Sequence, residues 1–191
     1  MGKMKYYIPS GSWPLKIDLY HKLMKKCEFI EGCQNSADIL ILPGGSDIGI
    51  RKERDDFEFN VYAKWVKAEK PVLGICRGMQ IMLTTENALI IQHIPEKTTE
   101  IMHTTVSGDW KGQSSWHTTS SGLLTNSRHH QGFFAQDIPD SWAILDKTTD
   151  KIVEAIQRKN CFAVQWHPEH DEMKNTDAQD WWITNVKSFI L

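Results

Sequence analysis

Short apolar runs that alternate with helical patterns limit the folds open to this chain most strongly. Residues 38–42 and 72–75 are mainly apolar and of strand length; glycines follow the first run and interrupt the second. Such runs are typical of strands buried on both faces, as in parallel sheets. Residues 14–26, 55–69 and 77–85 carry apolar residues at helical spacing. This alternation predicts a parallel sheet with helices on both of its faces.

The second half of the chain differs, because strand patterns follow one another there with few helices between them. Together with a first strand near the N-terminus, strands are expected at residues 5–8, 104–106, 142–145, 152–156 and 162–165. A last helix is expected at residues 177–190. We therefore expect an α/β protein with an open mixed, mainly parallel sheet flanked by helices, and with a β-rich excursion. Residues 1–191 are expected to form a single domain.

Composition argues against several classes of function. The net charge of the 191 residues is −2, which gives no basic surface for nucleic acid or an acidic membrane. No apolar run approaches the roughly 20 residues of a membrane span, and no apolar segment typical of a signal peptide follows Met1. The four cysteines include no CxxC pair, so a zinc site or a disulfide scaffold is poorly supported. We expect a cytoplasmic protein without a membrane or nucleic-acid partner.

Cys76 lies in the sequence Gly74-Ile75-Cys76-Arg77-Gly78, which has the pattern of a nucleophile elbow. The two glycines allow the chain to turn sharply from a strand into a helix. The exposed amides and dipole of the helix N-terminus would stabilise a thiolate, and the amide of Arg77 would face a developing oxyanion. The alternative is an inert buried cysteine, a common state of intracellular thiols. The elbow pattern favours a nucleophile.

A cysteine nucleophile needs a general base and a group that orients this base. The segment VQWHPEH, residues 164–170, places His167 directly after an apolar strand and Glu169 two residues further on. A carboxylate at this spacing can orient an imidazole and fix its tautomer. His170 and Asp171 are close enough to be alternatives, and a surface histidine in a turn is the simpler interpretation. The predicted nucleophile at the same edge of the sheet favours His167 as the base.

The segment LPGGSD, residues 42–47, supplies a second set of backbone amides. It ends a buried strand in Gly44 and Gly45, where the backbone can approach a ligand closely. Gly45 or Ser46 could therefore donate a second hydrogen bond to an oxyanion at Cys76. The alternative is an ordinary turn, because Pro-Gly-Gly is common in turns.

Together, LPGGSD, GICRGMQ and VQWHPEH resemble, in their order and strand-end context, the class I glutamine amidotransferase family with a Cys-His-Glu triad. The resemblance covers nearly the whole chain. It implies that Cys76 is the nucleophile, His167 the base and Glu169 the third member of the triad. It also implies that the amides of Gly45 and Arg77 form the oxyanion hole.

Two further segments resemble the peptidase C26 branch, which includes hydrolases similar to γ-glutamyl-γ-aminobutyrate hydrolase. The first is NSRHHQ at residues 126–131, and the second is the RDxFE pattern at residues 54–58. The branch cleaves a γ-glutamyl amide through a γ-glutamyl thioester and releases glutamate, without a metal or organic cofactor. The resemblance implies a small-molecule γ-glutamyl conjugate as the partner. It implies substrate contacts from Gly44, Ser46, Gln80, Ser127, Arg128, His129 and His130. The alternative for His129 and His130 is a solvated loop.

The leaving group is less constrained by the sequence. The region between residues 42 and 68 is short for the branch, which would leave room for a bulky leaving group such as a nucleotide phosphoramidate. Arg51, Lys52 and Arg54 are candidates to contact its phosphates, although a charged run is usually a solvated face. Residues 87–88, Asn-Ala, replace the usual glycines after the nucleophile helix, and asparagine still permits a left-handed turn.

Three other functions fit parts of the pattern. The chain could be a glutaminase subunit that supplies ammonia to a synthase. It could be an inactive, amidotransferase-like binding protein, although intact Cys76, His167 and Glu169 argue against this. It could also belong to the wider group of α/β proteins with a cysteine elbow, which includes chaperones and proteases but lacks the WHPE segment.

Overall fold

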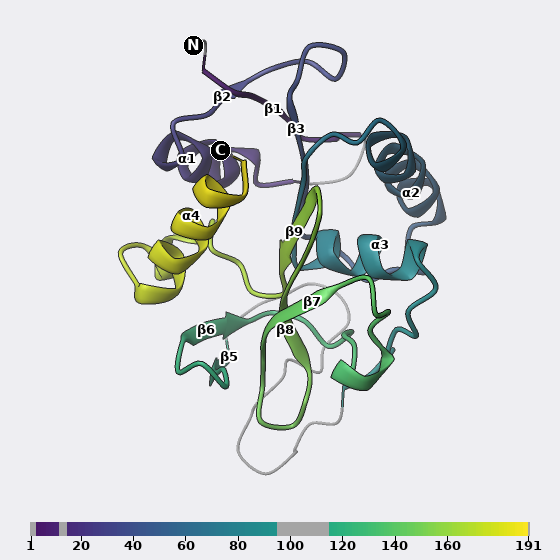
Figure 1. Cartoon of the computed structure of the whole chain (residues 1–191), viewed down its shortest axis with the longest axis vertical. Helices are drawn as coiled ribbons and strands as arrows, with labels where there is room; N and C mark the ends of the chain where they lie inside the picture. The colour runs from purple at the N-terminus through teal and green to yellow at the C-terminus, as the bar shows by residue number, and fades with distance from the viewer. Residues whose placement is uncertain (1–2, 12–14, 95–114, 191) are drawn as a thin grey trace.

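The computed structural model describes residues 3–11, 15–94 and 115–190. Its main element is a seven-stranded sheet with the order β2-β1-β3-β4-β9-β8-β7 (Figure 1). The strands are β1 (Lys5–Tyr7), β2 (Ile30–Glu31), β3 (Ile39–Leu42), β4 (Val72–Ile75), β7 (Ala143–Lys147), β8 (Val153–Arg158) and β9 (Cys161–Val164). Neighbours from β2 to β9 pair in parallel, whereas β8 pairs antiparallel with both β9 and β7. The expected mixed, mainly parallel sheet is confirmed.

Helices cover both faces of this sheet. Figure 1 shows α1 (Ile17–Lys26) and α4 (Asp177–Ile190) on one face, and α2 (Lys52–Lys67) and α3 (Arg77–Thr85) on the other. Two 3₁₀ turns complete the helical elements, η1 (Ala135–Asp137) and η2 (Asp171–Met173). The β-rich excursion contains a separate antiparallel pair, β5 (Ser115–Thr118) and β6 (Leu124–Ser127).

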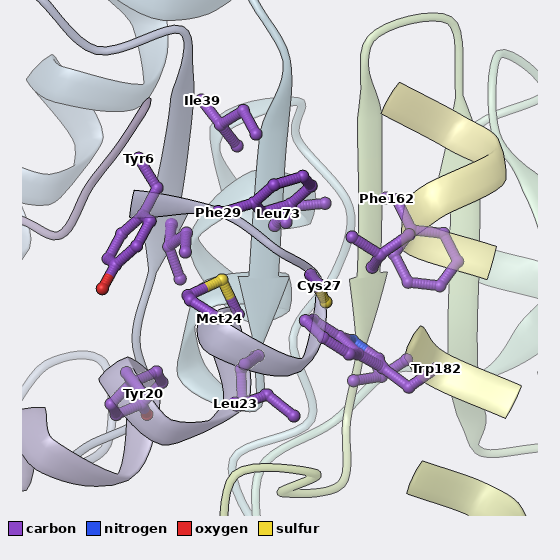
Figure 2. Packing of buried hydrophobic residues seen from close by; sticks show 14 of the residues in the cluster. Tyr6, Tyr20, Leu23, Met24, Cys27, Phe29, Ile39, Leu73, Phe162 and Trp182 are labelled. Carbon is purple, nitrogen blue, oxygen red and sulfur yellow. The ribbon is translucent and has the colours of Figure 1, made fainter. Parts of the chain in front are cut away.

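The side chains of the sheet fill two apolar cores, one under each layer of helices. Along β3, Ile39 and Ile41 pack with α1 and α4, whereas Leu40 and Leu42 pack with α2 and α3. This division follows from the alternation of side chains along a strand. Figure 2 shows part of the first core, where Met24 and Trp182 approach the sheet from α1 and α4. Burial of both faces explains why the central strands are continuously apolar.

The structure corrects several expected boundaries. The first helix begins at Ile17, and the second begins at Lys52, so its first turn contains the charged residues that precede Asp55. Phe57, one of the apolar residues at helical spacing in that helix, is 36% exposed. The short strands β2, β5 and β6 were not predicted from the sequence. The strand expected at residues 104–106 lies outside the described residues.

The topology brings the three sequence motifs to one edge of the sheet. β3, β4 and β9 are consecutive neighbours and run parallel, so their carboxyl ends lie side by side. LPGGSD follows β3, Cys76 follows β4, and VQWHPEH includes the end of β9. In open sheets of this type, ligands bind beyond the carboxyl ends of the strands.

Candidate active site

Cys76 occupies a strained turn between β4 and α3. Its φ angle is +51° and its ψ angle is −107°, a backbone conformation that is unfavourable for a residue with a Cβ atom. A Cβ atom at Gly78 would lie 2.1 Å from the carbonyl oxygen of Leu42, and one at Gly74 would lie 2.9 Å from the Cβ of Ala163. The two glycines are therefore required by close packing of the turn. This geometry matches that of a nucleophile elbow.

His167 and Glu169 form the second part of the site. The His167 Nδ1 atom lies 2.7 Å from Glu169 Oε1, and both residues are buried. Because the carboxylate accepts, Nδ1 carries the proton and Nε2 is left for Cys76. Burial alone would lower the pKa of His167, but the charges of Cys76 and Glu169 outweigh it and raise this pKa to about 10. With this pKa the His167 imidazole is protonated at neutral pH and lies beside the Glu169 carboxylate.

The pKa of the Glu169 carboxyl is shifted in the opposite direction. Burial raises it, but the charge of His167 and its hydrogen bond outweigh burial and hold the pKa below its usual value. His170, the alternative base, lies 3.8 Å from the same Glu169 oxygen. Burial lowers the pKa of His170 to about 4, so it is neutral at pH 7. The shorter contact with Glu169 belongs to His167, as expected.

Asn126 fixes the backbone of His167. The His167 N–H donates to Asn126 Oδ1 at 2.8 Å, and Asn126 Nδ2 donates to the His167 carbonyl at 3.4 Å and to Glu172 at 2.7 Å. Asn126 lies on β6, so the excursion from the main sheet contributes to the site. We did not predict this contact, although Asn126 begins the NSRHHQ segment.

Tyr20 of α1 is a second residue of the site that sequence reasoning missed. Its hydroxyl accepts a hydrogen bond from the Gly44 N–H at 2.8 Å. Burial raises the pKa of Tyr20 well above its usual value, and the charge of the neighbouring Glu169 adds to this effect. A Cβ atom at Gly44 would lie 2.7 Å from His167 Cε1. Gly44 therefore packs directly against the imidazole of His167. Tyr20 links Gly44 to the carboxylate of Glu169.

The backbone amides predicted to form the oxyanion hole have no hydrogen-bond acceptor within the described part of the protein. Within the described residues, neither the Gly45 N–H nor the Arg77 N–H donates a hydrogen bond to a protein group. Gly45 and Ser46 are exposed, whereas Gly44 is buried. The Gly45 N–H follows β3, and the Arg77 N–H follows the neighbouring strand β4, at the start of α3.

The predicted contacts of Arg54 with substrate phosphates are wrong. The Arg54 side chain is 2% exposed and forms an ion pair with Glu58 at 2.8 Å. Arg51 and Lys52 are exposed, and Lys52 forms an ion pair with Asp56. Of the three charged residues, Arg51 and Lys52 therefore lie on a solvated face, as the alternative interpretation expected, and Arg54 does not.

The segment that contains His129 and His130 is not a solvated loop, because both side chains are buried. His129 Nδ1 donates to the Gln131 carbonyl at 2.9 Å, and His130 Nε2 lies 3.1 Å from Asp47. Ser127 is also buried, whereas Arg128 forms an ion pair with Glu172 at 2.8 Å. The segment is packed against the candidate site.

Two glutamine side chains attach this segment to α3 and to the oxyanion turn, the name used here for residues 43–48 after β3. Gln131 exchanges hydrogen bonds with the backbone of Ile48, accepting at 2.9 Å and donating at 3.0 Å. Gln80 Nε2 donates to the Gln131 carbonyl at 3.1 Å. Gln80, a predicted substrate contact, thus lies on α3 and binds the backbone of the NSRHHQ segment.

A metal ion would have to compete with the candidate triad. In the described part of the chain, the group of side chains arranged to hold an ion is His167, Glu169 and His170, whose ligand atoms lie within 4.8 Å of one another. Two of these three side chains form the hydrogen bond that orients the imidazole. An ion at this position would break that hydrogen bond.

A hollow of about 430 Å³ borders the site between α1 and η2. It reaches the triad through His170, whose ring lies edge-on to that of His167 at 5.0 Å between centroids. The lining residues are Lys16, Asp18, Leu19, Lys22, His170, Asp171 and Glu172. The shortened region between residues 42 and 68 does not line this hollow.

The fold is that of glutamine amidotransferases. A glutamine amidotransferase structure from Thermotoga maritima matches with a TM-score of 0.63 and 16% sequence identity, over 97% of this chain and 83% of the other. At this identity the likeness defines the fold alone. No helix in the described ranges combines the length and the apolar character needed to cross a membrane.

Sequence comparison defines the family within this fold. The Peptidase C26 family model matches residues 23–169, and the chain belongs to this family. A glutamine amidotransferase-like protein, YvdE of Lactococcus lactis, is 27% identical in an alignment of 169 positions that covers 75% of this chain and 71% of the relative. The γ-glutamyl-CDP-amidate hydrolase of Campylobacter jejuni is 26% identical over 157 residues, covering 78% of this chain and 70% of the relative. The family supports a cysteine-dependent enzyme that acts on amide C–N bonds.

Proposed function

We propose that this protein hydrolyses a γ-glutamyl amide with Cys76, His167 and Glu169 as its triad. The observation that carries this proposal is the His167–Glu169 hydrogen bond of 2.7 Å beside a cysteine held at a positive φ angle. A buried, oriented imidazole next to an elbow cysteine is suited to acyl transfer. Glutamate is the released product.

The reaction proceeds in two steps. The Cys76 thiolate attacks the side-chain carbonyl of the γ-glutamyl group, and the amides of Gly45 and Arg77 hold the oxyanion. His167 gives its Nε2 proton to the leaving nitrogen, so the C–N bond breaks and a γ-glutamyl thioester remains. His167 then takes a proton from water, which attacks the thioester and restores the thiolate. Each oxyanion donor of this kind is worth about 3 kcal/mol of transition-state stabilisation.

The proposed leaving group is bulky, and a nucleotide phosphoramidate is our specific choice. The relative from Campylobacter jejuni is named for such a substrate. The NSRHHQ segment, which resembles the hydrolase branch, packs against the oxyanion turn through Gln131. The hollow beside His170 offers space for the leaving group, and its lysines Lys16 and Lys22 are candidate phosphate contacts in place of buried Arg54.

A glutaminase subunit that feeds ammonia to a synthase is the second candidate. It is favoured by the glutamine amidotransferase-like relative from Lactococcus lactis. The two candidates differ only in the leaving group, because the same thioester forms from free glutamine. The chemistry of the triad alone does not separate them.

A substrate panel tests the choice between these candidates. Purified protein would be mixed with free glutamine, γ-glutamyl polyamines, γ-glutamyl amino acids and γ-glutamyl nucleotide phosphoramidates, and released glutamate would be measured with Cys76→Ala as the blank. We expect the phosphoramidate to give the highest kcat/KM and free glutamine a weak or negligible rate, because a truncated substrate loses transition-state contacts. If glutamine is the best substrate of the panel, the hydrolase proposal fails and the subunit proposal replaces it.

A further inference from the structure

A buried cluster of four charged side chains lies beneath the turn that follows β3. Glu58 accepts from Arg54 Nε at 2.8 Å and, through its second oxygen, from Arg77 Nε at 2.8 Å. Arg77 Nη2 also donates to Asp55 at 2.5 Å. Each of the four side chains is at most 8% exposed. The reaction proposed above assigns no step to these side chains.

Both guanidinium groups also hold backbone carbonyls of the turn. Arg54 Nη2 donates to the Gly44 carbonyl at 3.0 Å, and Arg77 Nη1 donates to the Ser46 carbonyl at 2.8 Å. Glu58 binds both arginines, so the two carbonyls are held by a single ionic cluster. Such charge-assisted, multidentate contacts give geometric specificity as well as energy.

These contacts determine the direction of the Gly45 amide. In a trans peptide the C=O of one residue and the N–H of the next point in opposite directions. The Gly44 carbonyl points at Arg54, so the Gly45 N–H points away from the cluster. The other end of Gly44 is held by Tyr20, which accepts from its N–H at 2.8 Å. The Gly44–Gly45 peptide, which carries the proposed oxyanion donor, is therefore held at its carbonyl by Arg54, and the preceding Pro43–Gly44 peptide is held at its N–H by Tyr20.

Arg54 also excludes any side chain at Gly45. A Cβ atom at Gly45 would lie 2.1 Å from Arg54 Nη1 and 2.7 Å from Cζ. The guanidinium therefore packs directly against the glycine. Rotation of the Gly44–Gly45 peptide would break the carbonyl contact.

We infer that Arg54 is a positioning residue that fixes the Gly44–Gly45 peptide, so that the Gly45 N–H faces the oxyanion formed at Cys76. The inference rests on the proposed role of Cys76 as an acylated nucleophile, but on no particular substrate. In this role Arg54 acts through the peptide and not on the reacting atoms. Its loss should slow reactions that pass through a tetrahedral oxyanion and leave the reactivity of the thiolate intact.

Two reactions of Cys76 separate this role from a purely structural one. Acylation by p-nitrophenyl acetate forms an oxyanion and requires no γ-glutamyl recognition. Alkylation by iodoacetamide is a displacement at carbon and forms none. Both rates would be measured in a Cys33→Ser background, because Cys33 is exposed and its pKa is lowered by hydrogen bonds with Ser36. The Cys76→Ala variant supplies the blank.

The test variant is Arg54→Lys, which keeps the charge opposite Glu58 but cannot hold Glu58 and the Gly44 carbonyl as a guanidinium does. We expect acylation to fall roughly 10- to 1,000-fold, with alkylation and its pH profile changed less than about two-fold. The matched control is Arg158→Lys, which alters an ion pair with Glu86 at the opposite end of the sheet. The control should change neither rate.

The inference is overturned if Arg54→Lys lowers both rates equally, or lowers neither. It is also overturned if wild-type Cys76 is acylated no faster than the blank, because the turn then provides no oxyanion stabilisation. If Arg54→Lys does not fold, Glu58→Gln serves instead; it loosens the guanidinium and should give a smaller loss confined to acylation. Failure of the substrate panel would leave these rates unaffected, so the two failures are distinguishable.

Discussion

At the scale of single residues, the strain at Cys76 links stability to catalysis. A residue with a Cβ atom at φ +51° costs about 1–3 kcal/mol, which glycine avoids. Glycine also loses more conformational freedom on folding, by about 0.5–1 kcal/mol. We therefore predict that Cys76→Ala and Cys76→Gly both abolish turnover, and that Cys76→Gly is the more stable by about 1 kcal/mol. Urea unfolding measures the difference, and a less stable Cys76→Gly would contradict the strained elbow.

The assignment of the base is tested by its neighbour. His167→Asn should lower kcat by orders of magnitude, and Glu169→Gln by less, because a group that orients the base is partly dispensable. His170→Asn, the matched control, should leave kcat on a small γ-glutamyl amide nearly unchanged, because its contact with Glu169 is longer, at 3.8 Å. The wrong histidine has been chosen if His170→Asn is the more damaging in steady-state kinetics.

The raised pKa of His167 also predicts how stability depends on pH. His167 titrates near 6.5 in an unfolded chain and near 10 in the folded protein. Between these values the folded state binds more protons, so the contribution of His167 is complete below about pH 6.5 and is lost as the pH rises towards 10. Urea unfolding across this range should show a decline that is smaller in Glu169→Gln, which lacks the carboxylate charge that helps to raise the pKa of His167. An equal decline in both proteins would contradict the ion pair.

At the scale of secondary-structure elements, the start of α1 places two lysines at the hollow, Lys16 just before the helix and Lys22 within it. If phosphates of the leaving group bind there, Lys16→Glu and Lys22→Glu should raise the KM for a nucleotide phosphoramidate several-fold. They should leave the kinetics on a small, uncharged γ-glutamyl amide unchanged. Lys25→Glu is the matched control, because it makes the same charge change on α1 but does not line the hollow. Equal effects of all three variants would indicate only a change in overall charge.

The same elements show which parts of the site could be predicted from the sequence. Cys76, His167 and Gly45 each follow a strand, and strand ends can be recognised from apolar runs and glycines. Tyr20 and Asn126 could not be found in this way, because their partners Gly44 and His167 lie 24 and 41 positions away in the sequence. Helical periodicity assigns buried positions to apolar residues, so it also missed buried Arg54 on α2.

At the scale of the whole molecule, the sheet order was the feature that most needed the structure. The alternating pattern predicted a parallel sheet, but not that β3, β4 and β9 are neighbours. The pair β5–β6 was missed because SWHT and LTNS lack the apolar alternation of half-buried strands. In contrast, the left-handed conformation that asparagine permits at residue 87 is present, with a φ angle of +65°.

During turnover, Cys76 is expected to carry a γ-glutamyl thioester. The most direct test is intact-protein and peptide mass spectrometry after acid quenching of the protein with its best γ-glutamyl conjugate. The expected result is a mass increase of one γ-glutamyl group, located on the peptide that contains Cys76 and absent from Cys76→Ala. Release of glutamate without this adduct at any quench time, or with an adduct on another residue, would contradict it.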